Sequence, residues 1–485
     1  MDSRGLMVVR IGLLVIILGF FAGSLGYGVW TERAAGDLGA LPRGNGTDPG
    51  LRVRLWNDRE LMGEAAAPPR PLPDFEELRI GVIAPALIWS PDDGQEPPNE
   101  RVRRLAPGSQ VRILPSVEGL IVSSKQIDGG KDLVWEVARV RIQPLIDGQD
   151  PGRPALVDPL RFERPDRSPW LAVGQHRFRG SIDVVKTGPR ALMAVNQLPV
   201  EAYLEGVVAR EMGAQYPLEA LKAQAIAARG VAFVKSRLAQ AAQREYDLVN
   251  TVDDQRYLGQ GVGTEVVRRA VAETRGVVML ARGNPFEPRY HASSGGFTAS
   301  VDDIAPGARD ARGQWQLAQT AMTARPDPAW QPAVAATGRE NTHGTTTVVL
   351  KGAQIREALA PLFAPAGRVI GHIRYIRVEQ RDPVSDRVET LVIGHAPQDE
   401  LTISAHAFRM ALGPEVLRST LWSRDSPRRE PGPGGAIQWV FTCSGWGHGV
   451  GMSQISAGWL AGQGRTASNI LLRFYGPDVN LWQLW

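Results

Sequence analysis

Short runs of alternating apolar and polar residues fill the first half of the chain, and glycine, proline and aspartate separate them. This period of two predicts β-strands, and runs of this length are too short for most helices. We therefore expect a β-rich module that leads into the main domain. The expected strands are Leu78–Ile83, Val111–Leu114, Gly119–Ser123, Leu133–Ile142, Arg177–Val185 and Ala191–Val195.

Helical spacing replaces this pattern over residues 198–238. Two helical segments meet at Glu211, and the second starts after Pro217, a residue that the start of a helix accepts. Alanines and large apolar residues surround the axis of the second segment, which is typical of a helix buried on most sides. Lys222 and Arg229 lie seven residues apart in it and therefore share one face.

Charged side chains on such a helix are expensive unless they are paired or functional. Glu211 is the carboxylate expected to pair with Lys222 and Arg229, directly or through a polar ligand that it also contacts. The alternative is structural, because a lysine or arginine on a buried helix often reaches solvent or forms an ion pair that only supports the fold. The local pattern leaves both interpretations open.

The later part of the chain mixes strands and helices. Gly276–Leu280 and Phe286–Ala292 predict a hairpin, whose second strand leads into the polar segment His291-Ala-Ser-Ser-Gly-Gly296. A long polar loop is expected at residues 302–342. The elements expected after it are helices at Gly352–Leu362 and His406–Leu412, strands at Ile370–Gln380 and Val388–Gly394, and a surface loop at Arg424–Gly435.

Glycine occupies every second position from 445 to 451, between Trp446, His448, Val450 and Met452. In an extended strand this pattern places side chains on one face and bare backbone on the other. Glycine inside a strand usually indicates close approach of a ligand or of another backbone. Two interpretations stay open: a sugar ring lies against the bare face, or the segment packs tightly beneath a helix. His448 is accordingly a base, a ligand or a core histidine.

An uncharged apolar segment, Ile11–Trp30, follows Arg4 and Arg10. A run of about 20 residues can span a bilayer as a helix, and basic residues before it favour an exported chain. We expect an uncleaved anchor in the cytoplasmic membrane, with signal cleavage and secretion as the alternative. The expected domains are residues 1–30 as cytoplasmic stub and transmembrane anchor, 31–75 as linker, 76–170 as β-rich module and 171–480 as main domain.

Composition excludes several classes of protein. The 485 residues carry a formal charge of +4 and no basic run interleaved with aromatics, so we expect no nucleic-acid partner. One cysteine, Cys443, cannot form an internal disulfide. No His-Glu-x-x-His or Gly-x-Ser-x-Gly motif is present, which argues against a zinc protease and an ordinary serine hydrolase. We expect no metal and no cofactor.

Several motifs follow one another between residues 178 and 477. They are Arg179-Gly-Ser, Asn196-Gln-Leu-Pro, Tyr203-Leu-Glu-Gly, Glu211-Met, residues 217–229, Asp254-Gln-Arg-Tyr, His291-Ala-Ser-Ser-Gly-Gly, Leu417-Arg-Ser, residues 445–454 and Ile470-Leu-Leu-Arg-Phe-Tyr. In this order they resemble the SpoIID/LytB family of stage II sporulation protein D-like proteins. The resemblance implies an α+β fold in which a mixed SpoIID-like catalytic domain follows the β-rich module.

The activity that this resemblance implies is lytic transglycosylation of peptidoglycan. The bond between N-acetylmuramic acid and N-acetylglucosamine is cleaved and a 1,6-anhydro end remains, with Glu211 as the essential acid. One carboxylate suffices, because the C6 hydroxyl of the substrate attacks the anomeric carbon while the same glutamate first donates and then accepts a proton. The substrate-binding residues expected beside it are Lys222, Gln224, Arg229, His291, Ser294, Gly295, Gly296, His448, Ser453 and Gln454.

Two non-enzymatic interpretations stay open. Related proteins are described as enhancers of cell-wall amidases, so the chain is alternatively a peptidoglycan-binding protein that recruits or stimulates an amidase. It is alternatively an envelope scaffold that binds a partner protein. Some members resemble zinc proteins with histidines and cysteines near the Ser-Gly-Gly motif. This chain has His291 there but no nearby cysteine, so the resemblance does not extend to zinc.

Overall fold

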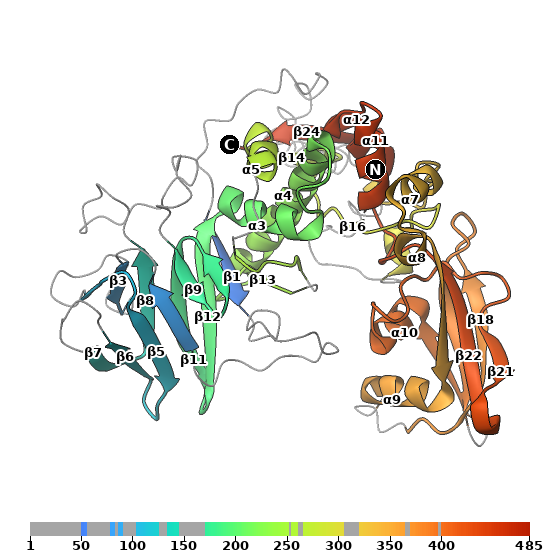
Figure 1. The fold of residues 1–485 in the computed structure, drawn as a ribbon, viewed down its shortest axis with the longest axis horizontal. Coiled ribbons are helices and arrows are strands. Elements are labelled where there is room, and N and C mark those ends of the chain that lie inside the picture. The colour runs from blue at the N-terminus through green and yellow to red at the C-terminus, as the bar shows by residue number, and fades with distance from the viewer. Residues whose placement is uncertain are drawn as a thin grey trace, which may run out of the picture.

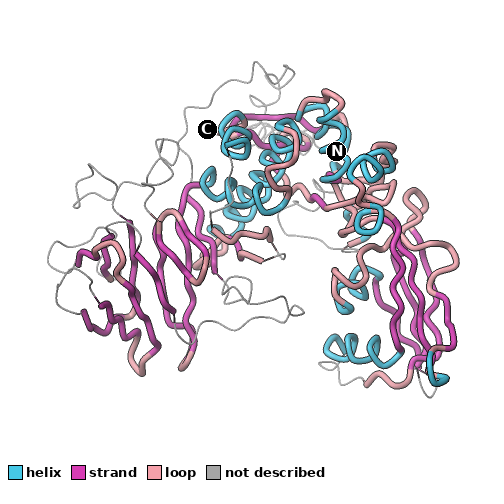
Figure 2. Tube along the Cα trace, viewed as in Figure 1, coloured by secondary structure: helices cyan, strands magenta, loops and turns pink. Residues whose placement is uncertain are grey.

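The computed structural model describes residues 50–55, 78–82, 86–90, 103–125, 133–144, 170–251, 254–259, 265–304, 320–363, 369–395 and 399–485. Figure 1 shows two β-sheets at one end, a helical group in the middle and a lobe of strands and helices at the other end. Strands dominate both ends, and several helices gather between them (Figure 2). The expected anchor at Ile11–Trp30 lies outside the described residues. Within the described ranges, no helix has the length and apolar character needed to cross a membrane.

Two sheets build the β-rich end. The larger has the order β13-β1-β12-β11-β8-β3-β4, and the smaller has the order β10-β9-β2-β5-β6-β7. Alternate residues of their strands enter one shared core, in which Val53, Ile80 and Val111 are fully buried. The strands are β1 Gly50–Leu55, β2 Leu78–Val82, β3 Ala86–Trp89, β4 Arg103–Leu105, β5 Gln110–Pro115, β6 Leu120–Lys125, β7 Leu133–Val137, β8 Arg139–Pro144, β9 Leu171–Val173, β10 His176–Phe178, β11 Ser181–Gly188, β12 Ala191–Pro199 and β13 Leu248–Val249.

Strand pairing crosses the domain boundaries expected at residues 75 and 170. β1 lies within the expected linker and pairs with β12 from Gly50↔Pro199 to Leu55↔Ala194. β9 pairs with β2, and β11 pairs with β8, so the expected module and main domain share both sheets. The alternation of apolar and polar residues in a strand does not indicate which strand it pairs with. The sequence therefore could not show that strand pairs cross residues 75 and 170.

The middle group surrounds α4. This helix packs against α3, α5, α11 and α12, and Leu221, Ala225 and Ala228 on it are fully buried, which confirms the predicted buried helix. The helices are α3 Val200–Glu211, α4 Leu218–Ala241, α5 Glu265–Glu273, α11 Gln454–Gly462 and α12 Ala467–Tyr475. The strands of this group are β14 Val277–Ala281, β15 Asn284–Pro285, β16 Tyr290–His291, β23 Met452–Ser453 and β24 Val479–Gln483.

The predicted hairpin after residue 276 is wrong in its second strand. β14 pairs with β15, whereas the segment predicted as that second strand contains β16, which pairs in parallel with β23. In that pairing Tyr290 faces Met452 and His291 faces Ser453. Parallel strands need a long connection, so a local pattern favours the nearer hairpin partner. The parallel pair brings two motifs together that lie about 160 residues apart.

Residues 345–444 form a lobe with its own core of buried residues that includes Phe408, Trp422 and Phe441. It contains the sheets β17-β22-β21 and β18-β19-β20. The expected helices and strands of this region are confirmed, but the expected loop Arg424–Gly435 contains β21. The elements are β17 Thr345–Lys351, α9 Gly352–Phe363, β18 Ile373–Arg381, β19 Val388–His395, β20 Asp399–Ser404, α10 Ala405–Leu412, β21 Arg428–Pro431, η7 Pro433–Gly435 and β22 Ile437–Ser444.

The polar region at 302–342 is only partly a loop. It overlaps a short turn of 3-10 helix, η5 Val301–Asp303, and contains the helices α7 Trp330–Thr337 and α8 Glu340–His343.

Candidate functional site

Glu211 is the last residue of α3, at the helix break that the sequence predicts. The N–H of Met212 donates to the carbonyl of Val208 at 3.1 Å, and Gly213 follows with φ +82°. Glycine adopts this left-handed conformation without strain, which is why it commonly ends helices. A Cβ at this position would also lie 2.5 Å from Oε1 of Gln215. Gly213 therefore ends α3 directly after the carboxylate.

Two donors hold the carboxylate of Glu211. The backbone N–H of Arg256 donates to Oε1 at 3.3 Å, and Nε2 of Gln454 lies 3.5 Å from Oε2. The same amide nitrogen donates to Oε1 of Gln224 at 3.3 Å. Gln454 and Gln224 are buried, and Glu211 is half-buried. Four segments meet here: the end of α3, the loop 254–259, α4 and the start of α11.

Burial dominates the protonation of Glu211. It raises the pKa of this carboxyl group, whereas the two hydrogen bonds and the charges of Arg256 and Arg210 lower it by less. Neither group that donates to the carboxylate, the backbone of Arg256 or the amide of Gln454, is itself an acid. Glu211 keeps its proton to a higher pH than an exposed glutamate.

The loop 254–259 is fixed by packing against α3. The ring of Tyr257 lies so close to Gly206 that a Cβ there would approach its Cε2 to 2.8 Å. Its centroid lies 4.9 Å from that of Tyr203, and its hydroxyl donates to Oδ1 of Asn196 at 2.9 Å. This packing fixes the position from which the N–H of Arg256 reaches Glu211.

A second hydrogen-bond chain lies near the carboxylate. The hydroxyl of Tyr203 donates to Oε1 of Gln255 at 3.3 Å, and Nε2 of Gln255 donates to the hydroxyl of Tyr290 at 2.8 Å. Burial raises the pKa of both tyrosines, and the charge of Glu211 raises both further. Both phenols therefore stay protonated at physiological pH.

Lys222 does not contact Glu211. Its Nζ lies 2.7 Å from Glu219 and 2.6 Å from Glu273, which belongs to α5. The pairing with Glu211 that the sequence suggested is therefore wrong for Lys222. Both carboxylates that it meets instead are about one-third exposed, as is usual for an ion pair near the surface.

Arg229 is fully buried and also binds a different carboxylate. Its Nε and Nη2 donate to the two oxygens of Glu201 at 3.0 and 2.7 Å, and its Nη1 donates to the carbonyl of Val277 at 2.9 Å. The expected contact with Glu211 is wrong, because the guanidinium pairs with Glu201 instead, and Arg229 has no exposed surface. The structural alternative holds, since this arginine joins α3, α4 and the start of β14.

The glycine-alternating segment is not a regular strand. All four glycines have φ between +72° and +117°, which the predicted extended backbone would not give. Protein atoms fill the space beside each of them. A Cβ would lie 2.6 Å from the carbonyl oxygen of Ser293 at Gly445, 2.7 Å from Cβ of His291 at Gly447, 2.4 Å from Cζ of Arg387 at Gly449 and 1.9 Å from the carbonyl oxygen of Arg289 at Gly451. Close packing against neighbouring protein atoms therefore explains why glycine stands at these four positions.

His291 and His448 lie side by side, with ring centroids 5.7 Å apart. Nδ1 of His291 lies 3.1 Å from the carbonyl oxygen of Val450, and Nδ1 of His448 accepts from the N–H of Val450 at 3.0 Å. Burial lowers the pKa of His291 to about 3 and that of His448 well below its usual range. Their hydrogen bonds go to Val450 and not to Glu211. The side chain of His291 is buried, and that of His448 is half-buried.

Ser294 and Ser453 are fully buried in one hydrogen-bond network. Ser294 donates to Oδ2 of Asp327 at 2.7 Å, and Ser453 reaches the same carboxylate through Ser456. Neither serine has exposed surface, and this network occupies the hydroxyl groups of both. Through Asp327, this network connects the segment before α7 to α11.

Gly295 and Gly296 remain partly exposed. A Cβ at Gly295 would lie 2.6 Å from the carbonyl oxygen of Ser444, and one at Gly296 would touch the ring of Trp330 at 3.4 Å. These positions form a close junction between the segment after β16 and its neighbours.

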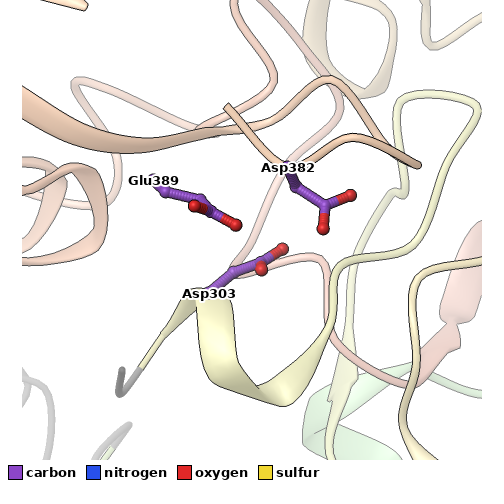
Figure 3. A group of neighbouring side chains, drawn as sticks. All are labelled: Asp303, Asp382 and Glu389. Carbon is purple, nitrogen blue, oxygen red and sulfur yellow. The ribbon is translucent and has the colours of Figure 1, made fainter. Parts of the chain in front are cut away.

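A separate group of carboxylates lies where η5 meets the lobe. Figure 3 shows Asp303, Asp382 and Glu389 with their carboxyl groups turned toward one another, and one oxygen of each lies within 4.8 Å of the others. Such oxygens suit a hard cation such as Ca²⁺. Burial and the charge of Asp382 raise the pKa of Asp303 to about 7, and Arg387 opposes this rise. Asp303 therefore holds a proton near neutral pH.

A polar hollow of about 440 Å³ lies in the lobe, lined partly by Arg381, Arg424 and Asp425. It shares no residue with the surroundings of Glu211 and contributes nothing to that site.

Three residues near Glu211 were not expected from the sequence: Gln255, Arg256 and Tyr290. Gln255 and Arg256 lie within the motif Asp254-Gln-Arg-Tyr, and Tyr290 directly precedes the His291 motif. Their position in motifs was a usable signal, but nothing in the sequence placed them beside Glu211.

Comparison with known proteins finds one family model and several relatives. Residues 189–280, which contain Glu211, Gln224 and Gln255, match the family model for the stage II sporulation protein SpoIID. Stage II sporulation protein D of Bacillus amyloliquefaciens is 26% identical over 317 residues, which cover 62% of this chain and 78% of that protein. An uncharacterised protein of Brachyspira hyodysenteriae is 35% identical over 113 residues, 23% of this chain and 30% of that protein.

A third relative is the amidase enhancer of Bacillus subtilis strain 168. It is 23% identical over 302 residues, which cover 57% of this chain and 40% of that protein. The ordered motifs, the family match around Glu211 and these relatives agree with one another. Residues 189–280 match the SpoIID family model, and the chain is similar to proteins of the SpoIID/LytB family.

Proposed function

We propose that this chain is a peptidoglycan lytic transglycosylase that cleaves the bond between N-acetylmuramic acid and N-acetylglucosamine. Its match to the SpoIID family model and its likeness to stage II sporulation protein D and to an amidase enhancer support a role at the cell wall. The observation that carries the proposal is the environment of Glu211. It is a half-buried carboxylate of raised pKa that two donors hold in place.

Glu211 performs both proton transfers of the reaction. Its protonated carboxyl group donates to the glycosidic oxygen as the bond between that oxygen and the anomeric carbon breaks. The C6 hydroxyl oxygen of the same N-acetylmuramic acid then bonds to the anomeric carbon, and its proton passes to the carboxylate. The acid is restored, no water is consumed, and the product carries a 1,6-anhydro ring.

This route needs only one carboxyl group, unlike ordinary hydrolysis. Most glycosidases use two carboxyl groups, one as acid and one as nucleophile or base. The substrate hydroxyl takes the place of the second group here. The raised pKa of Glu211 favours the protonated form that the first step requires. Gln454 and Gln224 then act as groups that orient the carboxylate.

The test exposes the purified chain to glycan strands with and without stem peptides and analyses the products by mass spectrometry. Wild type is expected to release anhydro-muramyl ends, and Glu211→Gln is expected to release none. Glu273→Gln is the matched control, since it removes a carboxylate from the surface pair with Lys222 and should keep full activity. Absence of anhydro ends with wild type on both substrates would overturn the proposal.

The alternative is a non-catalytic peptidoglycan-binding protein that stimulates a cell-wall amidase. The likeness to the amidase enhancer favours it. In the same assay this function predicts glycan binding without any product, and a faster release of stem peptides when an amidase is added. That stimulation would persist in Glu211→Gln.

We also propose that Ile11–Trp30 anchors the chain in the cytoplasmic membrane, with the rest on the outer side. A reporter fused to the C-terminus tests the orientation. A fusion that is active only in the cytoplasm would contradict it.

A further inference from the structure

Tyr290 stands at the end of a hydrogen-bond chain with a defined direction. Tyr203 donates to the carbonyl oxygen of the Gln255 side chain, and the amide nitrogen of Gln255 donates to the Tyr290 hydroxyl. Gln255 is only 2% exposed, so protein groups rather than solvent fix its amide. Because Tyr290 accepts from Gln255, its own O–H points elsewhere. Among the described residues, none accepts that proton within hydrogen-bond distance.

The fold places this hydroxyl in the neighbourhood of Glu211. Tyr290 pairs with Met452 across the β16–β23 ladder, and Gln454, which contacts Glu211, follows two residues later. Tyr290 is half-buried, unlike the fully buried Tyr203 at the other end of the chain. The charge of Glu211 contributes to the raised pKa of Tyr290, which agrees with this proximity. The donor is therefore protonated, and the residue that carries it is only half-buried.

We propose that the Tyr290 hydroxyl binds the substrate beside Glu211 by donating to the acetamido carbonyl oxygen of an N-acetylated sugar. This inference rests on the proposed function. A carbonyl oxygen only accepts hydrogen bonds, whereas a sugar hydroxyl also donates. Since a lone pair of Tyr290 already receives the proton of Gln255, an acceptor is the complementary partner. A site built to donate in this way discriminates against a ligand that lacks the acceptor.

The variant that tests this is Tyr290→Phe, which keeps the ring and removes the hydroxyl. Tyr475→Phe is the matched control. The hydroxyl of Tyr475 donates to the carbonyl of Arg289 at 2.7 Å, and the side chain is buried. Both changes are made in Glu211→Gln as well, so that binding is measured without turnover. The probes are peptidoglycan glycan strands with their acetamido groups and the same strands after removal of the acetyl groups.

Tyr290→Phe is expected to weaken binding of the acetylated strands about tenfold and to leave binding of the deacetylated strands unchanged. The preference for acetylated strands should persist in Tyr475→Phe. A preference that survives in Tyr290→Phe, or an equal loss for both strands, would overturn the inference. A folding defect is recognised separately, by a Tm lower than that of wild type.

Product analysis separates this result from the proposed function. If wild type forms no anhydro ends but Tyr290→Phe removes the acetyl preference in binding, the transglycosylase proposal fails and the Tyr290 assignment stands. If wild type forms anhydro ends but Tyr290→Phe keeps the preference for acetylated strands, the transglycosylase proposal stands and the Tyr290 assignment fails.

Discussion

Arg229 and Glu201 form a two-point ion pair inside the molecule, with Nε–Oε1 and Nη2–Oε2 distances of 3.0 and 2.7 Å. Both side chains are essentially without exposed surface. Oε1 of Glu201 also accepts from the backbone N–H of Gly276 at 3.0 Å. This pair connects the first turn of α3 to α4 and to the start of β14, and it holds in place the helix whose last residue is Glu211.

Removing one member of this pair should destabilise the fold strongly. Arg229→Met leaves the carboxylate of Glu201 buried without its cation, which is expected to cost about 3–5 kcal/mol of unfolding free energy. Lys222→Met, on the same helix face, should cost less than about 1 kcal/mol, since its pair lies near the surface. Urea denaturation measures both. The double change Glu201→Met with Arg229→Met should be less destabilising than Arg229→Met alone, and equal losses would contradict the buried-charge explanation.

Gln454 should set the pH dependence of activity. Burial raises the pKa of Glu211, and the hydrogen bond from Gln454 lowers it by a smaller amount. In the proposed reaction Glu211 must start protonated, so kcat/KM falls as the pH rises through its pKa. Gln454→Leu removes the opposing hydrogen bond, and the alkaline limb of the pH profile should therefore move to higher pH. The profile of Glu273→Gln should be unchanged, and a shift of the Gln454→Leu limb toward lower pH would refute the assignment.

Gly449→Ala should destabilise the protein because its Cβ would lie 2.4 Å from Cζ of the buried Arg387, at a φ of +84°. Left-handed backbone alone costs an L-residue roughly 1–2 kcal/mol, and the contact adds to it. Gly462→Ala is the comparison. It lies at the end of α11 with nothing within 4 Å of the added Cβ, so it should be neutral or stabilise by up to about 1 kcal/mol. Thermal unfolding distinguishes the two variants. A Gly449→Ala protein as stable as wild type would contradict the close packing of Arg387 against this glycine.

Asp303 should make stability depend on pH. Its pKa is about 7 in the folded protein, mainly through burial and then Asp382, and about 3.9 when unfolded. The folded state therefore binds the proton more tightly. Its contribution to stability is complete below about pH 4 and is lost as the pH rises to about 7.

Asp303→Asn should accordingly raise the unfolding free energy at pH 8 by about 4 kcal/mol and change it little at pH 4. The side-chain oxygen of asparagine still accepts from the N–H of Ser300, which preserves the cap of η5. Denaturation curves are recorded in a chelator so that no cation neutralises the cluster. Asp302→Asn is the control, and a gain of the same size from that variant would indicate a general charge effect.

The sequence by itself determined the local features of the middle group. Apolar spacing predicted a helix buried on most sides after Pro217, and the structure has α4 there. It predicted a helix break at Glu211, where Gly213 ends α3. The shared face of Lys222 and Arg229 was also correct, since both side chains reach α5 or the residues that follow it. These features follow from interactions between residues a few positions apart, which periodicity and turn preferences report directly.

Only the tertiary structure decided which groups meet. Gln454 contacts Glu211 although 243 positions of sequence separate them. Arg229 pairs with Glu201, 28 positions away, and not with Glu211. The parallel pairing of β16 with β23 places Tyr290 near the carboxylate, and Arg387 fills the space that glycine leaves at 449. A hydrophobic pattern specifies which face of an element is buried, but not what that face packs against. Packing and hydrogen-bond partners depend on the simultaneous fit of distant segments, and only the folded chain brings those segments together.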